Sequence, residues 1–412
     1  MSFIKTPVKG MNDFLPSDMR IREYVLSVIK ETYQSFGFAQ IETPICEHIE
    51  NLQSNQGGEN EKLIFKILKR GDKLNLNSAE TQADLVDSGL RYDLTLPLAR
   101  YYANNSENLF TPFKALQIGN VFRADRPQKG RFRQFTQCDI DILGDDSMLA
   151  ETELVSATTT LLLKLGFENF RVRINDRRIL KAMAKSCGLS DDMLPNVYIS
   201  LDKLDKIGAN GVKAELLKIG LTEETADKYL EMFLDREGKS CSQICKSLGE
   251  FIDPSVPEGI DELMNNVKAS LGEKFELDFD PTLVRGMGYY TGTIFEIEMK
   301  ELNSSVAGGG RYDEMIGKFG ANPTPACGFS IGFERIITIL KDRGFVVPTT
   351  KKGIAFLVDK KASAESIANT FKEASLLRAE GNRVMVTKRN KNARRQKELL
   401  ETEEYFDIRE VF

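Results

Sequence analysis

The stretch from Phe122 to Gly144, FRADRPQKGRFRQFTQCDIDILG, decides how the central part of this chain folds. Within it, polar and apolar residues alternate from Phe135 to Ile142. Alternation with a period of two predicts a β-strand that has one apolar face toward a core and one polar face toward a cavity. Residues that favour a turn, Pro127 and Gly130, precede this strand. We therefore expect an antiparallel hairpin with its turn at Pro127–Gly130.

The turn of this hairpin is densely basic. Five arginine and lysine residues lie between positions 123 and 133, with Asp125 as the one acid among them. An arginine guanidinium can hold two phosphate oxygens at once, so this density is typical of a phosphate-binding site. The period of the preceding strand places Arg123 and Asp125 on the same face. The local pattern leaves one alternative open, a solvated basic turn on an ordinary hairpin.

The composition is that of an ordinary globular protein. The chain has 412 residues, of which 41% are hydrophobic and 28% charged, and this length is enough for about two or three domains. Because the net charge is −5, a nucleic-acid partner would have to meet a local basic surface. No apolar run is long enough for a transmembrane helix and the N-terminus lacks the apolar segment of a signal peptide, so no membrane partner is expected.

Cysteine and histidine usage limits the chemistry that is available. The six cysteines are scattered, and Cys241 and Cys245 are spaced as a pair on one face of a helix. His48 is the one histidine in the chain, so a zinc site or a histidine-based catalytic triad has few candidate residues. No metal-ligating residue is therefore assigned. The absence of a disulfide framework favours a reduced, cytoplasmic setting.

The spacing of apolar residues divides the chain into four parts. Residues 1–176 mix helices and strands and form the first part of the core. Residues 177–275 are rich in Leu, Lys and Glu with a helical period, which predicts a helical insertion domain. Residues 276–346 return to strand-type sequence and form the second part of the core. Residues 353–412 predict a small α/β domain, and the whole is expected to be an α+β fold.

Three segments with glycines follow the insertion, namely Arg285–Ile297, Val306–Tyr312 and Ala326–Ile336. Glycine lets the backbone approach a ligand closely, and the tyrosine pair of the first segment supplies a flat apolar wall. The run AGGGRY in the second segment is expected to precede a helix, where an anionic ligand could bind. The alternative for these segments is a packed strand with a glycine bulge.

The candidate residues together combine several arginines and polar strand faces with no nucleophile–base pair. The arginines are Arg123, Arg131, Arg133, Arg285 and Arg335. In phosphoryl or nucleotidyl transfer the protein mainly positions groups and stabilises charge, so this set of residues favours such a reaction.

Four motifs occur in the order found in the histidyl-tRNA synthetases, a family of class II aminoacyl-tRNA synthetases. They are LRYDLT at 90–95, the hairpin at 122–144, RGMGYYTGTIFEI at 285–297 and ACGFSIGFERI at 326–336. The segments GMNDFLP at 10–16 and the one ending at Thr43–Pro44 also resemble that family's opening and first class motif. The resemblance covers roughly residues 5–340. It implies an antiparallel sheet flanked by helices, a homodimer, and ATP-dependent activation of L-histidine for transfer to tRNA(His).

The resemblance also implies a role for each matching residue. Arg123 would bind the α-phosphate of ATP, and Arg285 would contact it in the transition state, so these two are the catalytic candidates. Phe135 would stack on the adenine. The ATP-binding residues would be Arg123, Asp125, Arg131, Arg133, Phe135 and Arg335, with Mg²⁺ accompanying the nucleotide. The histidine-binding residues would be Asp93, Thr95, Gln137, Asp141, Tyr289, Tyr290 and Tyr312. The basic turn at 126–133 would receive the acceptor end of the tRNA.

Two features depart from the family pattern. Gly288 stands where an acid is expected before the tyrosine pair. The C-terminal unit is shorter than the family's anticodon-binding domain, and we expect it to end in a helix over residues 393–406, without the later strands of that module. Lys388–Lys397 holds six basic residues and no acid, which is consistent with a contact to the tRNA backbone and equally with a solvated helix start.

Two alternative functions follow from these departures. The histidine-binding regulatory subunit of ATP phosphoribosyltransferase shares the core fold and lacks the anticodon domain. The retained arginines at positions 123, 285 and 335 argue against it, because a module that only binds histidine does not need them. The other alternative is a histidine-activating enzyme that does not charge tRNA.

Overall fold

The computed structural model describes residues 3–54, 60–77, 79–128, 130–234, 238–272, 274–284, 289–301, 304–320, 322–348 and 353–412. The chain forms two compact units, of which the first comprises residues 1–12 and 27–340 and the second residues 13–26 and 341–412. Helix α1 (Pro16–Ser35) begins in the second unit and continues into the first.

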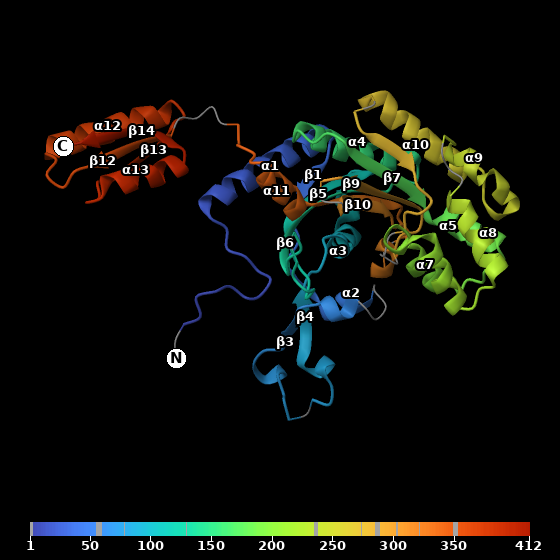
Figure 1. Cartoon of the computed structure of the whole chain (residues 1–412). Coiled ribbons are helices and arrows are strands. Elements are labelled where there is room, and N and C mark those ends of the chain that lie inside the picture. The colour runs from blue at the N-terminus through green and yellow to red at the C-terminus, as the bar shows by residue number, and fades with distance from the viewer. Residues whose placement is uncertain are drawn as a thin grey trace. The chain divides into compact units, whose positions relative to one another are not determined.

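The first unit is built on an eight-stranded sheet in the order β1-β5-β6-β11-β10-β9-β7-β8 (Figure 1). The inner neighbours from β5 to β7 pair antiparallel, whereas β1 on β5 and β8 on β7 add parallel edges. The strands are β1 (Ala39–Ile41), β5 (Phe113–Phe122), β6 (Gln134–Leu143), β7 (Phe170–Asp176), β8 (Glu276–Phe279), β9 (Thr293–Met299), β10 (Ser304–Arg311) and β11 (Ala326–Gly332). The expected α+β fold with an antiparallel sheet flanked by helices is confirmed.

The hairpin predicted around the basic turn is formed by β5 and β6. Their residues pair from Phe113↔Leu143 to Phe122↔Gln134, and an isolated bridge between Gln128 and Arg131 closes the turn. The apolar side of β6, with Ile140 and Ile142, is completely buried. Its polar side faces a cavity, as the alternation predicts.

Helix α4 (Met148–Lys164) covers the apolar side of the sheet, where it packs on β6 and β11 (Figure 1). It begins at Ser147, whose hydroxyl accepts a hydrogen bond from the Leu149 amide. A buried ion pair holds it to the sheet, because Arg311 on β10 meets both carboxylate oxygens of Glu151 at 2.7 Å. Helix α11 (Phe333–Asp342) follows β11 directly.

A smaller three-stranded sheet in the order β2-β4-β3 forms an arm on the first unit. Its strands are β2 (Cys46–His48), β3 (Lys66–Leu68) and β4 (Val86–Leu90), with helix α2 (Ile49–Ser54) beside them. Pro44 lies between β1 and β2, which belong to different sheets. After β4 the chain enters helix α3 (Thr95–Asn105). Asp93 and Thr95 therefore do not lie on a strand: β4 ends at Leu90, Asp93 lies in the connection and Thr95 opens the helix.

The segment after β7 is helical, as its period predicts. Its helices are α5 (Arg177–Ser186), α6 (Leu194–Leu201), α7 (Leu204–Lys218), α8 (Glu223–Leu234), α9 (Cys241–Cys245) and α10 (Ser255–Leu271). Cys241 and Cys245 are both buried on the short helix α9, which confirms that they are a helical pair. A short 3-10 helix, η5 (Lys246–Phe251), lies between α9 and α10, and others elsewhere are η1 (Asn60–Leu63), η2 (Gly71–Lys73), η3 (Gln82–Leu85), η4 (Ser106–Asn108) and η6 (Ile316–Phe319).

The second unit contains a parallel sheet in the order β13-β12-β14, formed by β12 (Gly353–Val358), β13 (Arg383–Lys388) and β14 (Tyr405–Val411). The predicted helices are α12 (Ala364–Ala379) and α13 (Ala393–Thr402). The expectation of a helix through residue 406 with no later strand is wrong, because the chain leaves α13 and returns to pair with β12. Tyr405 is buried in that sheet.

No helix within the described ranges combines the length and the apolar character that crossing a membrane requires.

Candidate functional site

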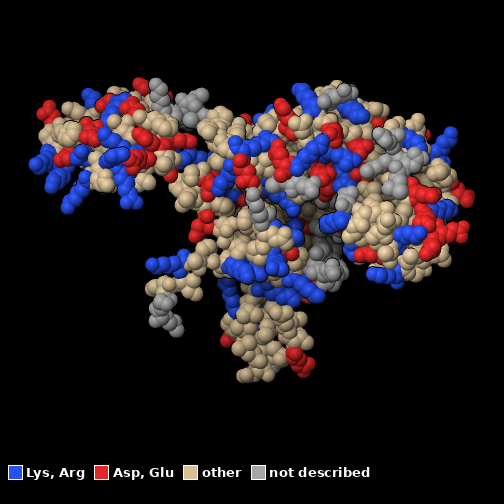
Figure 2. Space-filling model, in the orientation of Figure 1, with Lys and Arg blue, Asp and Glu red and all other residues tan. Residues whose placement is uncertain are grey.

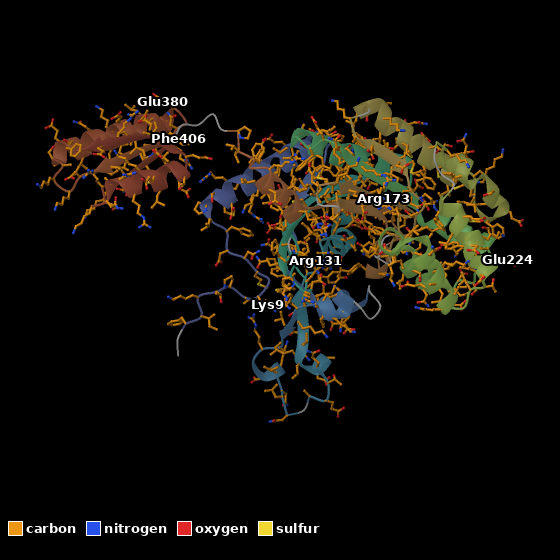
Figure 3. The ribbon with its side chains drawn as sticks, viewed as in Figure 1. Lys9, Arg131, Arg173, Glu224, Glu380 and Phe406 are labelled. Carbon is orange, nitrogen blue, oxygen red and sulfur yellow. The ribbon has the colours of Figure 1, made fainter. Side chains whose placement is uncertain are left out.

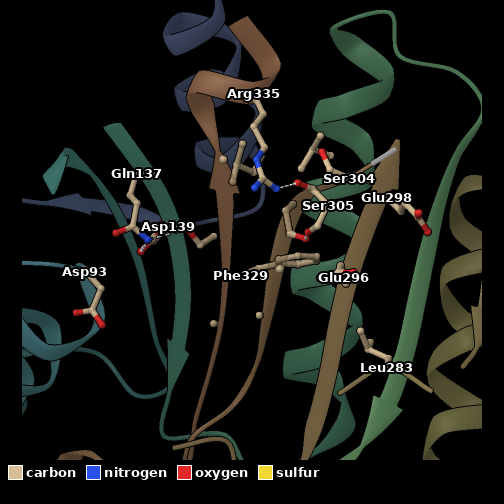
Figure 4. Close-up of a pocket in the computed structure, with 18 of the residues that line it drawn as sticks. Asp93, Gln137, Asp139, Leu283, Glu296, Glu298, Ser304, Ser305, Phe329 and Arg335 are labelled. Atoms are coloured by element: carbon tan, nitrogen blue, oxygen red, sulfur yellow. Dashed lines mark hydrogen bonds between the residues drawn. The ribbon is translucent and has the colours of Figure 1, made fainter. Parts of the chain in front are cut away.

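A cavity of about 1210 Å³ opens on the polar side of the main sheet. Strands β6, β7, β9, β10 and β11 contribute to its walls, and the loop before α3 and the junction of α6 and α7 border it (Figure 4). Twelve residues that the sequence predicts as binding residues line it: Asp93, Thr95, Arg123, Asp125, Arg131, Phe135, Gln137, Asp141, Tyr289, Tyr290, Tyr312 and Arg335. Segments more than 200 residues apart in the sequence thus meet at one site.

One end of the cavity presents arginines and an aromatic ring. The Nε of Arg123 donates to the backbone carbonyl of Tyr92 at 2.9 Å, and its guanidinium carbon lies 5.2 Å from the centre of the Phe135 ring. These two contacts hold Arg123 at the point where β5 ends. Arg335, in the first turn of α11, donates to the carbonyl of Ser305 on β10. Cations held in this way can meet phosphate oxygens without first being ordered.

The basic turn itself is partly tied to the hairpin. Arg131 pairs with the Asp125 carboxylate at 2.7 Å and is half exposed. Figure 2 shows Lys and Arg side chains gathered above the β3–β4 arm, and Figure 3 labels Arg131 and Lys9 in this region. Among the predicted ATP-binding residues that the structure describes, Arg133 does not line the cavity. Its Nε donates to the Asp125 carbonyl at 3.1 Å, and its backbone amide donates to the Gly10 carbonyl.

The other end of the cavity presents carboxylates and tyrosines. The hydroxyl of Tyr312 donates to Asp141 Oδ1 at 2.6 Å. The Tyr289 ring lies 4.8 Å from that of Tyr290 and 6.1 Å from that of Tyr312, so the three rings form one wall. Asp93 accepts a hydrogen bond from the Leu96 amide at 3.2 Å in the first turn of α3.

Several polar atoms at this end have no partner within the described part of the chain. They are Gln137 Oε1, Asp139 Oδ1 and Asp141 Oδ2, all buried. An unpaired buried acceptor is unfavourable in a native structure unless a ligand or water satisfies it. The arrangement therefore suits a ligand that carries N–H donors.

Burial also changes the acidity of these carboxyl groups. The pKa of Asp141 is raised to about 7: burial is the main cause, the hydrogen bond from Tyr312 opposes the shift, and the charge of the nearby Asp93 adds to it. Burial and the charge of Asp141 together raise the pKa of Asp139 well above its usual range. Burial likewise raises the pKa of Asp93. Bringing a cation among these carboxylates would favour their ionised forms.

A glycine leaves the room that Asp141 needs. A Cβ atom on Gly328 of β11 would lie 2.0 Å from Asp141 Oδ1 and 3.2 Å from Tyr312 Cε1. The expectation that the run at 308–310 opens a helix is wrong, because these glycines lie inside β10. There they allow close packing: a Cβ on Gly309 would lie 2.0 Å from the Gly328 carbonyl oxygen.

Sequence reasoning missed the charged wall of the cavity on β7 and β9. Arg173, labelled in Figure 3, pairs with Asp280 at 2.7 Å and lies 3.6 Å from Glu296, which is labelled in Figure 4. Glu298 lines the cavity one pleat further along β9, opposite Arg171. The signal was present in the segments FRVRIND and FEIEM, because their charged residues recur with period two. Asp139 was also missed, although its place in the alternation puts it on the polar face of β6.

Two residues singled out in the sequence, Arg285 and Gly288, lie outside the described residues. The described residues contain no group of three or more His, Cys, Asp or Glu side chains that could hold a metal ion.

Three comparisons with known proteins agree. The family model for histidyl-tRNA synthetase matches residues 10–336. The histidine–tRNA ligase of Leifsonia xyli is 43% identical over 405 residues, which span 94% of this chain and 90% of that protein. The crystal structure of histidyl-tRNA synthetase from Nostoc sp. PCC 7120 superposes with a TM-score of 0.79 at 27% identity, covering 97% of this chain and 90% of that one.

A further solved structure has the same fold. An ATP phosphoribosyltransferase regulatory subunit/histidyl-tRNA synthetase from Bacillus halodurans superposes with a TM-score of 0.79 at 20% identity, covering 100% of this chain and 99% of that chain. At this identity the likeness concerns the fold alone, so it does not separate a synthetase from a regulatory subunit.

Proposed function

Because the chain belongs to the histidyl-tRNA synthetase family, we propose that it activates L-histidine with ATP and transfers the activated histidine to the 3′ end of tRNA(His). The observation that carries this proposal is the single cavity in which the end with Arg123, Phe135 and Arg335 adjoins the end with Asp141 and Tyr312. One end suits a nucleotide and the other suits an imidazole.

The chemistry needs both ends at once. A carboxylate oxygen of histidine attacks the α-phosphorus of ATP, the new O–P bond forms, and the bond to the β-phosphate breaks to release pyrophosphate. Two anions must approach one another in this step, so guanidinium groups have to screen the repulsion and stabilise the charge that develops. A ribose hydroxyl of the tRNA then attacks the acyl carbon, and AMP leaves.

The nucleotide end would work as follows. Arg123 contacts the α-phosphate, Phe135 stacks on the adenine, and Arg335 meets the terminal phosphates. Arg131 would assist through the basic turn, and Asp125 would accept from the adenine amino group once Arg131 turns to a phosphate. Arg133 does not line the cavity, and its role in ATP binding rests on the resemblance alone. Mg²⁺ would enter with ATP, held mainly by the phosphates, since the described residues offer no metal cluster of their own. The metal would neutralise charge on the leaving pyrophosphate.

The histidine end would recognise the imidazole by its two ring nitrogens. Asp141 and the tyrosine hydroxyls can accept from one nitrogen and donate to the other, which a purely apolar pocket cannot do. Asp93, Thr95 and Gln137 would hold the rest of the amino acid. The family resemblance assigns Arg285 to the α-phosphate in the transition state.

The regulatory-subunit alternative is not favoured, because curated relatives over most of the chain are histidine–tRNA ligases. Three further features stay proposals that rest on the resemblance: a homodimer built partly on the segment ending at Thr43–Pro44, a helical insertion domain over 177–275, and an anticodon-binding-like domain over 353–412. A cytoplasmic location also stays a prediction.

Histidine-dependent exchange of labelled pyrophosphate into ATP tests the activation step. We expect exchange by the intact protein with Mg²⁺, and its loss in Arg285→Ala with the thermal unfolding midpoint unchanged. A folded wild-type protein that gives no exchange would refute the proposal. Charging of tRNA with labelled histidine then tests the second step. If the protein exchanges pyrophosphate but charges no tRNA from several sources, it is a histidine-activating enzyme that does not charge tRNA.

A further inference from the structure

We propose that Asp139 is an additional specificity-determining residue, which binds the α-ammonium group of the amino acid. This inference rests on the proposed histidine activation and names a contact within the same site. It concerns a residue that the motif resemblance does not assign.

Asp139 lies on the middle one of three neighbouring strands, β5, β6 and β11. On β6 it lies between Gln137 and Asp141 on the polar face, paired with Gln117 of β5 and with Ser330 of β11. The side chain lines the cavity although the residue is only 4% exposed. Figure 4 shows it beside Gln137, whose Nε2 lies 3.5 Å from Asp139 Oδ2. A buried carboxylate in this place is therefore directed at whatever fills the cavity.

The surrounding side chains leave one oxygen of Asp139 unsatisfied. The amide group of Gln117 donates to the Leu94 carbonyl at 3.1 Å, and no hydrogen bond from it reaches Asp139 Oδ1. Gln137 directs its amide group to the Ser330 hydroxyl at 3.1 Å, closer than to Asp139. Asp139 Oδ1 consequently has no hydrogen-bond donor among the described residues. A ligand that brings an N–H group would satisfy it.

The order of residues along β6 identifies which part of histidine reaches Asp139. Residues on the same face of a strand are spaced by roughly 6.6 Å. Asp141 and Tyr312 mark the imidazole end, whereas Phe135 and Arg123 mark the ATP end. Asp139 lies between them, at a distance from Asp141 comparable with the reach of a histidine side chain. The α-carbon and its ammonium group would therefore lie next to Asp139.

The charge balance of the cavity supports the same assignment. Asp93, Asp139 and Asp141 lie close enough that each affects the ionisation of another. Arg123 and the buried Arg91 both interact with the charge on Asp139, and in the reaction Arg123 would turn to phosphate. The substrate carboxylate is directed at ATP as well. The ammonium group would then supply positive charge to the carboxylates at this end in place of Arg123.

Comparing Asp139→Asn with the wild-type protein tests this inference. The variant keeps the size of the side chain and removes its charge. We expect the Kd for histidine, measured by titration calorimetry, and the histidine KM in pyrophosphate exchange to rise about tenfold or more, because a charged hydrogen bond is lost. The KM for ATP should change by less than about threefold. Imidazole-4-propionate, which is histidine without its α-amino group, should inhibit the variant at least as well as the wild-type protein.

The matched control is Asp278→Asn, which removes one carboxylate from β8 of the same sheet, where Asp278 pairs with Arg171 and does not line the cavity. This control should leave the binding of histidine and of imidazole-4-propionate unchanged. Asp139→Glu provides a second variant that keeps the charge, and it should keep the preference for histidine over the deaminated analogue. If Asp139→Asn lowered the affinity for histidine and for imidazole-4-propionate equally, Asp139 would have a structural role and the inference would be overturned. A wild-type protein that neither binds histidine nor exchanges pyrophosphate would instead refute the proposed function, so the two failures are distinguishable.

Discussion

Replacing Gly328 with alanine should damage the imidazole end of the site through a single methyl group. The backbone at Gly328 has no positive φ, so alanine can adopt it, and the effect comes from space alone. The new Cβ would lie 2.0 Å from Asp141 Oδ1 and 3.0 Å from its Cγ. Because Gly328 and Asp141 are paired across β11 and β6, the carboxylate has to move and gives up the 2.6 Å hydrogen bond from Tyr312.

The size of the effect follows from that hydrogen bond. A hydrogen bond to a charged group contributes about 1.5–3 kcal/mol, which corresponds to roughly a 10- to 150-fold rise in the Kd for histidine. Crowding of the packed sheet should also lower the free energy of unfolding by about 1–3 kcal/mol. Titration calorimetry with histidine and urea unfolding measure the two quantities separately. The KM for ATP in pyrophosphate exchange should change little, because Arg123 and Phe135 are untouched.

Gly317→Ala is the matched control, since the nearest atom that its Cβ would meet lies 4.0 Å away, at Pro323. Both variants change the unfolded chain in the same way, so the difference between them reports the site. If Gly328→Ala folds and binds histidine within about threefold of the wild-type protein, then the contact between Asp141 and Tyr312 does not position the imidazole.

The remaining predictions concern acidity, charge and stability. Burial gives Asp141 a pKa of about 7, so the Kd for histidine should rise as the pH falls from 8 to 6 and the acceptor is protonated; a flat profile would contradict this role. The folded-state pKa lies above the unfolded value, so Asp141 contributes stability below the unfolded pKa that is lost as the pH rises through about 7. Asp141→Asn should therefore flatten the dependence of the unfolding midpoint on pH in the absence of histidine. Arg123→Ala should reduce exchange by about 100-fold or more, whereas Arg133→Ala, outside the cavity, should change exchange by less than about fivefold; equal losses would mean that the cavity geometry does not separate their roles. Glu151→Ala should lower the free energy of unfolding by about 3–5 kcal/mol in urea, because it leaves Arg311 buried without its partner; a change below about 1 kcal/mol would show that solvent reaches this pair.

The sequence predicted best where the signal was local. The hairpin of β5 and β6 depends on a period of two and on turn residues, which neighbouring positions determine. The helices after β7 likewise follow from a helical period. The first two residues of strand β14 were predicted as the end of a helix and no strand was predicted after them, because its charged residues alone do not indicate a strand. It is a strand because it pairs in parallel with β12, which lies about 50 residues earlier in the chain.

The glycine run in β10 shows the same limit. Three successive glycines are compatible with a loop, a helix start or a crowded strand, and the sequence does not distinguish among these. In the structure the run forms a strand with no room for a side chain at Gly309. A Cβ atom there would meet the carbonyl of Gly328 and the ring of Phe295 on the two neighbouring strands. Contacts across a sheet depend on the register between paired strands, which cannot be read from the sequence of one strand alone.

By itself the sequence therefore determined the family and the polar face of β6, and it supplied the arginines that we propose for phosphate and the carboxylates and tyrosines that we propose for an imidazole. Only the tertiary structure decided which of them meet. It joined Asp141 to Tyr312 across 171 positions, left Arg133 out of the cavity lining, and left Asp139 buried with an unsatisfied oxygen. The physical reason is that a side chain's type is a local property, whereas its partner and its burial are set by strands that pair over long distances in the chain.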